Sequence, residues 1–153
     1  MKSLRTWIGC IFTLLLASGC EPNVAPPANY MKCKLNGFNW QSLPDEVGAI
    51  YASTGQMVTF GGDDGTILIS ANISGVSGLG TYALGPATNG SLQVYMNSQF
   101  YYINTNFGSG NFYLDEIKNP DLTRHNIKGR FEGMATNLSN DTIFITEGEI
   151  ENF

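Results

Sequence analysis

The stretch HNIKGRFEGMAT, residues 125–136, alternates between two kinds of position along the chain. Ile127, Gly129, Phe131, Gly133 and Ala135 fall on one side of an extended chain, and mostly charged or polar residues fill the positions between them. A period of two is that of a β-strand with one buried face. Glycines that alternate with large residues favour a sharp bend or close packing against a facing sheet. The stretch therefore predicts a long strand inside a β-sheet.

Short runs rich in Val, Ile, Tyr and Phe occupy the rest of the chain, separated by clusters of Gly, Asn, Asp and Ser. Asn36-Gly37 supplies the positive φ values of a tight hairpin, and Asp63-Asp64-Gly65 is typical of a turn. No window carries a long helical stripe. The sequence predicts an all-β fold, an antiparallel β-sandwich or barrel-like domain. The predicted strands are residues 31–35, 38–41, 48–53, 56–61, 66–73, 81–84, 92–96, 100–104, 111–117, 125–136 and 142–150.

Residues 1–19 have the composition of a secretory signal peptide. Lys2 and Arg5 precede an apolar core over residues 7–17, and small residues follow at 17–19. The apolar core is too short to cross a bilayer as a helix.

The run LLLASGC, residues 14–20, resembles the lipobox of bacterial lipoproteins, although Ala17 stands where Leu is usual. This resemblance implies that Cys20 is acylated and becomes the first residue of the mature protein, anchoring it in a membrane. The alternative is an ordinary secretory signal without lipid.

Residues 20–29 are expected to form a linker, and residues 30–153 a single β domain. Pro22, Pro26 and Pro27 favour an extended linker that would hold the domain near the membrane surface.

Without Lys2 and Arg5, the chain keeps 6 basic and 13 acidic residues, a net charge of −7. This balance argues against binding to nucleic acid, which needs clustered cations. It also argues against electrostatic binding to anionic lipid.

The chain has three cysteines. Cys10 would leave with the signal and Cys20 would carry lipid, so Cys33 would remain alone. We expect Cys33 to be a buried, small hydrophobic residue of a strand. A Cys20–Cys33 disulfide in a protein without lipid is the alternative.

Several motifs in a fixed order resemble a family of small Bacteroidota lipoproteins of unknown function. The segments are KLNGFNW (34–40), GTYAL (80–84), SGNFYL (109–114), IKGRFEG (127–133) and TIFITEGEI (142–150). The resemblance covers residues 31–153, with departures at Leu114, where Ile is commoner, and Ile150, where Phe is usual. It implies an antiparallel β domain and an envelope location, and it carries no known catalytic residues.

The resemblance makes the outer membrane the expected location. Lipoproteins of such bacteria are often exported to the cell surface when acidic residues cluster just after the acylated cysteine. Here Glu21 is the only acidic residue directly after Cys20, which leaves the periplasmic and the surface-exposed face of the membrane equally open. Asp141-Thr142-Ile143 resembles the sequon for O-glycosylation in this phylum, so Thr142 is a candidate modification site. A turn that leads into the last strand explains the same residues.

No catalytic, metal or cofactor site is predicted. The chain has one histidine, His125, and this number excludes a multi-histidine metal site. His125 is expected at an exposed edge of the sheet. Asp63 and Asp64 could bind Ca²⁺ but are explained by a turn. A general acid and base could be sought in Asp45-Glu46 or in Asp115-Glu116. Adjacent residues of a strand point to opposite faces, so neither dipeptide forms a facing pair of carboxylates by itself.

Aromatic side chains are the better candidates for binding. Trp40, Tyr95, Tyr101, Tyr102 and Tyr113 lie in or near predicted strands, where exposed rings can stack on sugars or anchor an interface. Tyr101 and Tyr102 point to opposite faces, so at least one of them is expected to face outward. The binding candidates are Trp40, Tyr95, Tyr101 and Tyr113. Cross-strand aromatic pairing that stabilises the sheet is the alternative.

These features predict a membrane-anchored envelope lipoprotein whose domain is a non-enzymatic binding module for a glycan, a protein or a small ligand. A structural or assembly subunit of an outer-membrane complex is the alternative. A hydrolase ranks last, because the sequence has no nucleophile elbow or metal motif.

Overall fold

The structure is a computed structural model that describes residues 29–118 and 124–152. The predicted signal peptide, Cys20 and nearly all of the linker lie outside these residues. The all-β prediction is confirmed, and a single 3₁₀ turn, η1 (Pro44–Glu46), is the only helical element of the described part. No described helix has the length and apolar character needed to span a membrane. The strands are β1 (Tyr30–Leu35), β2 (Phe38–Gln41), β3 (Val47–Ala52), β4 (Met57–Asp63), β5 (Leu68–Ser74), β6 (Gly80–Leu84), β7 (Gly90–Met96), β8 (Gln99–Ile103), β9 (Ser109–Ile117), β10 (Arg124–Thr136) and β11 (Thr142–Glu151).

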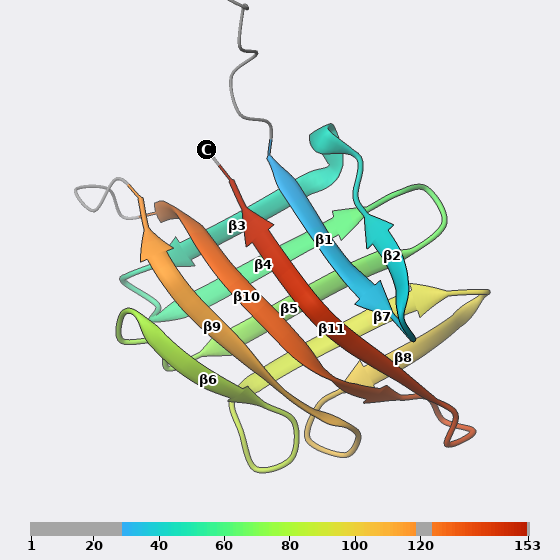
Figure 1. The fold of residues 1–153 in the computed structure, drawn as a ribbon. Helices are drawn as coiled ribbons and strands as arrows, with labels where there is room; N and C mark the ends of the chain where they lie inside the picture. Colours follow the sequence, from blue (N-terminus) through green and yellow to red (C-terminus); the bar gives the residue numbers. More distant parts are fainter. Residues whose placement is uncertain (1–28, 119–123, 153) are drawn as a thin grey trace, which may run out of the picture.

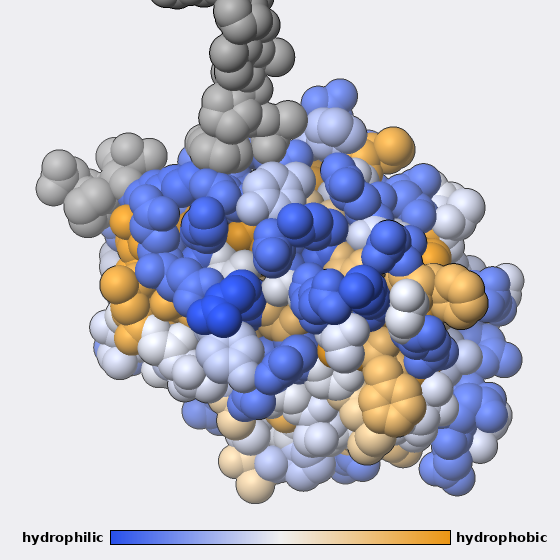
Figure 2. Space-filling model, viewed as in Figure 1, coloured by the Kyte–Doolittle hydropathy of each residue, from blue (hydrophilic) through white to orange (hydrophobic). Residues whose placement is uncertain are grey.

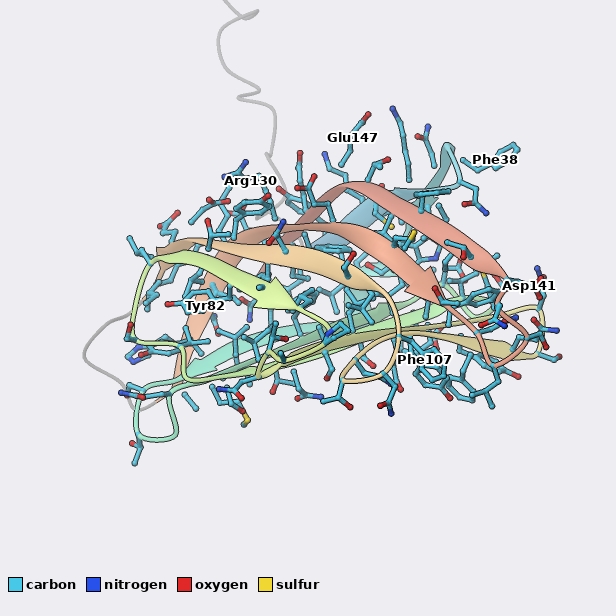
Figure 3. The ribbon with its side chains drawn as sticks, turned by 90° about the horizontal axis from the view of Figure 1, so that it is seen from below. Phe38, Tyr82, Phe107, Arg130, Asp141 and Glu147 are labelled. Atoms are coloured by element: carbon cyan, nitrogen blue, oxygen red, sulfur yellow. The ribbon has the colours of Figure 1, made fainter. Side chains whose placement is uncertain are left out.

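The strands form two stacked layers (Figures 1 and 3). Neighbours in the front layer follow the order β2-β1-β11-β10-β9-β6, and those in the back layer the order β3-β4-β5-β7-β8. All of these pairings are antiparallel. The fold is thus a sandwich-like arrangement in which each layer has one face toward the core and one toward solvent.

Strand β10 connects the two layers at both of its ends. Its first residues, 124–126, pair with β3, and its last residue, Thr136, pairs with Tyr102 of β8. Between these ends it pairs with β9 and β11 of the front layer. The stretch that carries the clearest alternation in the sequence is therefore the strand on which the architecture depends.

The core lies between the layers and is built around three phenylalanine rings. Phe60 of the back layer contacts Phe112 and Phe131 of the front layer, with ring centroids 5.0 and 5.3 Å apart. The predicted close packing of the β10 glycines is confirmed. A Cβ on Gly129 would lie 2.8 Å from a ring carbon of Phe112, and one on Gly133 would lie 2.6 Å from Cδ1 of Ile103.

The hairpin predicted from Asn36-Gly37 joins β1 to β2, with φ values of +50° and +85°. A second local feature, in β11, was not predicted. Glu147 has a φ of +52°, and the register with β1 and with β10 shifts close to it. The shift explains why Ile143 and Ile145 face inward while the next inward residues are Gly148 and Ile150.

The prediction that His125 is exposed is wrong. The side chain is 3% exposed, and its ring stacks on Tyr51 with centroids 5.6 Å apart. The reason is that β10 already pairs with β3 at this point, so His125 shares the inward phase of Ile127. Cys33, by contrast, is buried as predicted.

The two outer faces of the sandwich differ in chemistry. Five ion pairs lie over β1, β9, β10 and β11, and we call this side the charged face. Figure 2 shows the hydrophilic residues gathered over the middle of it. We call the outward side of β3, β4, β5, β7 and β8 the uncharged face. In its strands, Asp63, at the end of β4, is the only described residue with a charged side chain.

Candidate functional site

The uncharged face places the outward residues of neighbouring strands in rows. Ser70, Gln93 and Tyr102 lie side by side across β5, β7 and β8. The adjacent row contains Tyr95 and Phe100, which are also directly paired. Because side chains alternate along a strand, these residues point away from the core that Val94 and Ile103 fill.

Four aromatic rings follow one another along the β8 side of this face, and we call them the aromatic strip: Tyr95, Phe100, Tyr102 and Phe107. Ring centroids of successive members are 4.8, 6.0 and 6.5 Å apart. Phe100 is 44% exposed, although large aromatic side chains usually lie in the core. Tyr95, Tyr102 and Phe107 are half-buried, so the strip is a partly exposed aromatic band on the outer side of the sheet.

A turn after β8 positions the last ring of the strip. Asn104 Oδ1 accepts hydrogen bonds from the backbone N–H groups of Asn106, at 2.9 Å, and Phe107, at 3.1 Å. The backbone N–H of Asn104 in turn donates to the carbonyl of Phe107 at 2.8 Å. Figure 3 shows Phe107 at the back layer, on the opposite side of the molecule from Arg130 and Glu147.

Beside the strip lies a hollow of about 240 Å³ with neutral polar walls. We call it the amide groove; it is lined by Ser70, Asn72, Ser91, Leu92, Gln93, Tyr102 and Asn104, all but Leu92 with a polar side chain. Gln93 Nε2 donates to Ser70 Oγ at 2.9 Å, and Thr59 Oγ1 donates to Asn72 Oδ1 at 2.9 Å. Within the described chain these bonds leave Asn72 Nδ2 and Gln93 Oε1 unused. The groove thus offers both donors and acceptors without a charge.

A second hollow of about 220 Å³ lies on the other side of Tyr102, between β8 and the hairpin that joins β10 to β11. We call it the hairpin hollow; its walls are Gln99, Phe100, Tyr102, Asn137, Leu138 and Ser139. Tyr102 is the residue that both hollows share. The two hollows and the strip form one continuous surface, which is the candidate site.

The predicted binding aromatics are not brought together. Tyr95 lies in the aromatic strip. Trp40 is buried, and Tyr101 packs against the core from β8. Tyr113 lies on the charged face, where its hydroxyl donates to Glu132 at 2.6 Å and its ring lies 5.0 Å from the Arg130 guanidinium.

Phe100 and Phe107 were not among the predicted aromatic candidates, and Tyr102 was considered beside Tyr101 but not chosen as a site residue. The signal for Tyr102 was present in the sequence, because Tyr101 and Tyr102 must point to opposite faces of one strand. The aliphatic residue Ile103 is expected to point into the core. Because side chains alternate along a strand, Tyr101 then points inward as well, and Phe100 and Tyr102 point outward. No such signal existed for Phe107, whose position depends on the turn at Asn104.

The charged face is an ordered network of ion pairs. Arg130 forms two hydrogen bonds with Asp115, at 2.8 and 2.9 Å, and these lower the pKa of Asp115 below its usual value. Glu151 accepts from Lys118 at 2.8 Å and lies 3.1 Å from Lys128. Burial alone would raise the pKa of Glu151, but the two lysines outweigh it and hold the pKa below its usual value.

The other chemical candidates are accounted for by local structure. Asp64 Oδ1 accepts from the backbone N–H groups of Thr66 and Ile67, at 2.8 and 2.7 Å, so the turn interpretation of this segment is confirmed. No group of three or more His, Cys, Asp or Glu side chains in the described ranges could hold a metal ion.

Burial raises the pKa of Cys33 to about 12, which keeps the thiol protonated. Thr142 is exposed at the start of β11.

Comparisons of the chain with models of protein families, with curated proteins and with solved structures gave no match.

Proposed function

We propose that this protein is a membrane-anchored envelope lipoprotein whose β domain is a non-enzymatic carbohydrate-binding module. The observation that carries the proposal is the side-by-side arrangement of the aromatic strip and the amide groove. Sugars have apolar C–H faces and hydroxyl-rich edges. A surface that joins exposed rings to neutral donors and acceptors complements both properties.

The lack of charge on this face supports a neutral glycan over an anionic one. The cations of four ion pairs, Lys32, Lys34, Lys128 and Arg130, belong to strands of the front layer and are already engaged with carboxylates. An anionic polysaccharide on the uncharged face would find no basic side chain there within the part of the chain that is described. A neutral ligand needs none.

The location rests on the N-terminal sequence. In the proposal an acylated Cys20 holds the protein at the bacterial outer membrane, on its periplasmic or its surface-exposed side, and residues 21–29 act as a tether. Metabolic labelling with a fatty-acid analogue tests the anchor. The wild-type chain is expected to incorporate the label, and uptake by a Cys20→Ser variant would contradict acylation at this cysteine.

Affinity electrophoresis tests the binding function. The full-length chain, purified in detergent, migrates through gels that contain laminarin, mannan, xylan or starch. Retardation by at least one polysaccharide is expected for the wild type. Tyr102→Ala should abolish that retardation. Tyr113→Ala, a tyrosine of similar accessibility on the charged face, should leave it unchanged. Equal loss in both variants, or no retardation of the wild type by any of the four, would contradict the proposal.

An assembly subunit is the second candidate, favoured by apolar side chains exposed at one end of the front layer. Met134 of β10 pairs directly with Phe144 of β11, and both project to solvent. Cross-linking in membranes, followed by purification in detergent, tests this role. Recovery of a defined partner that is lost in a Phe144→Ser variant would support it, and recovery of uncross-linked monomer alone would contradict it.

A further inference from the structure

We infer that the ligand is a linear oligosaccharide segment of at least two sugar units that crosses Tyr102, with one unit in the amide groove and the next in the hairpin hollow. This inference rests on the proposed carbohydrate-binding function and adds the form of ligand that the surface accepts. Its basis is the presence of two hollows that share one aromatic wall.

The size of the hollows favours one unit in each. Their volumes of about 240 and 220 Å³ are both below the roughly 300–1,000 Å³ of pockets that enclose a drug-sized ligand. Neither hollow alone would bury enough of a longer ligand. Tyr102 stands between them, so a ligand that uses both must pass over its ring.

The two hollows differ in chemistry, which assigns them different roles. The amide groove retains unused polar atoms on Asn72 and Gln93 and suits the hydroxyl-rich edge of a sugar. In the hairpin hollow the Asn137 side chain is already occupied: its Nδ2 donates to Gln99 and to Asp141, both at 2.9 Å. The exposed apolar walls there are Phe100 and Leu138. This hollow therefore holds the second unit through apolar contact.

Hydrogen bonds within the hairpin position the wall of the hairpin hollow. Asn137 is 4% exposed, and its Oδ1 accepts from the backbone N–H groups of Ser139, at 2.9 Å, and Asp141, at 2.8 Å. The backbone N–H of Asn137 donates to the carbonyl of Asp141 at 3.0 Å. These bonds hold Leu138, which is 79% exposed, at the tip of the hairpin. A preformed wall of this kind reduces the entropy lost on binding.

Isothermal titration with oligosaccharides of one to six units tests the inference. The series is prepared from whichever of laminarin, mannan, xylan or starch retards the wild type. We expect affinity to rise at least about tenfold between one unit and two, because the second unit binds intramolecularly, and then to level off. Leu138→Ala should remove most of this gain and leave binding of the single unit unchanged. Gln93→Ala should weaken single-unit and longer ligands alike.

Leu79→Ala, at an exposed leucine before β6, is the matched control and should change neither quantity. A single unit that binds as tightly as the trimer would overturn the inference and leave the carbohydrate-binding function standing. A length-dependent gain that Leu138→Ala does not alter would also overturn it. Failure of all four polysaccharides to bind would instead overturn the proposed function, and the inference with it.

Discussion

Phe100 and Tyr102 leave β8 on the same side, and their ring centroids lie 6.0 Å apart with an interplanar angle of 17°. Near-parallel rings at this separation attract each other and hold each other in position. Tyr95, paired with Phe100 across the strands, extends the contact to β7. The strip is thus a continuous row of contacting rings in the unliganded structure.

The ring contacts predict a measurable stability term. Phe100→Ala should lower the free energy of unfolding by about 1 kcal/mol, because it removes the contacts with both Tyr95 and Tyr102. Phe38→Ala is the matched control, since Phe38 is 79% exposed and has no ring contact among the described residues. Its effect should stay within about 0.5 kcal/mol. Urea unfolding of the two variants measures the difference, and equal effects would contradict the ring contribution.

The close approach across β10 predicts a larger effect for a smaller change. A Cβ on Gly133 would lie 2.6 Å from Ile103 Cδ1 and 2.7 Å from the carbonyl oxygen of Ser109. Gly133→Ala should therefore cost about 1 to 3 kcal/mol through overpacking. Gly48→Ala, on the uncharged face, meets nothing within 4 Å and should be close to neutral. Thermal or urea unfolding checks both, and a neutral Gly133→Ala would show that β10 and its neighbours relax more easily than the packing indicates.

The Glu151 network predicts a pH-dependent contribution to stability. The folded state lowers the pKa of Glu151 below the ordinary 4.5, so its stabilisation is present above about pH 4.5 and is lost as the pH falls through the folded-state pKa. Glu151→Gln should lower the free energy of unfolding by about 1 to 2 kcal/mol at pH 7, because Lys118 and Lys128 lose a charged partner. The difference between variant and wild type should shrink as the pH falls below 4.5 and through the folded-state pKa of Glu151. A difference that is constant from pH 3 to 7 would contradict the assignment.

Cys33 is predicted to be unreactive in the folded protein. Burial raises its pKa to about 12, so almost no thiolate exists at pH 8 and iodoacetamide has no nucleophile to attack. Mass spectrometry should detect alkylation of this residue only after urea is added. A Cys33→Ala variant identifies any label that other cysteines take up. Modification of native Cys33 within minutes would contradict the buried position.

The strand pattern of the sequence was sufficient for the fold class, because burial of one face gives a local period of two that needs no knowledge of the partner strand. The alternation over residues 125–136 extends through the whole of β10. The same pattern could not reveal that β10 joins two layers, since pairing with β3 and β8 is a long-range property. His125 has the inward phase of Ile127, but this local pattern could not show that Tyr51 of β3 would cover a residue at the start of the strand.

The candidate site was predictable only in part. Tyr95 could be placed outward from its phase with Val94, and Tyr113 outward from its phase with Phe112 and Leu114. Which of the two outer faces each residue occupies depends on the layer to which its strand belongs. The layer of each strand follows from the strand order. Tyr95 of β7 and Tyr113 of β9 belong to different layers, so they lie on opposite outer faces of the sandwich.

Nuclear magnetic resonance can locate the surface on which a glycan contacts the domain. Backbone amide shifts of the ¹⁵N-labelled full-length chain in detergent micelles are recorded during titration with the trisaccharide of the polysaccharide that binds. We expect shifts concentrated at Asn72, Gln93 and Tyr102, with Tyr113 and the other amides of the charged face unmoved. Shifts confined to β10 and β11 of the charged face, or none at saturating trisaccharide, would contradict the proposed binding surface.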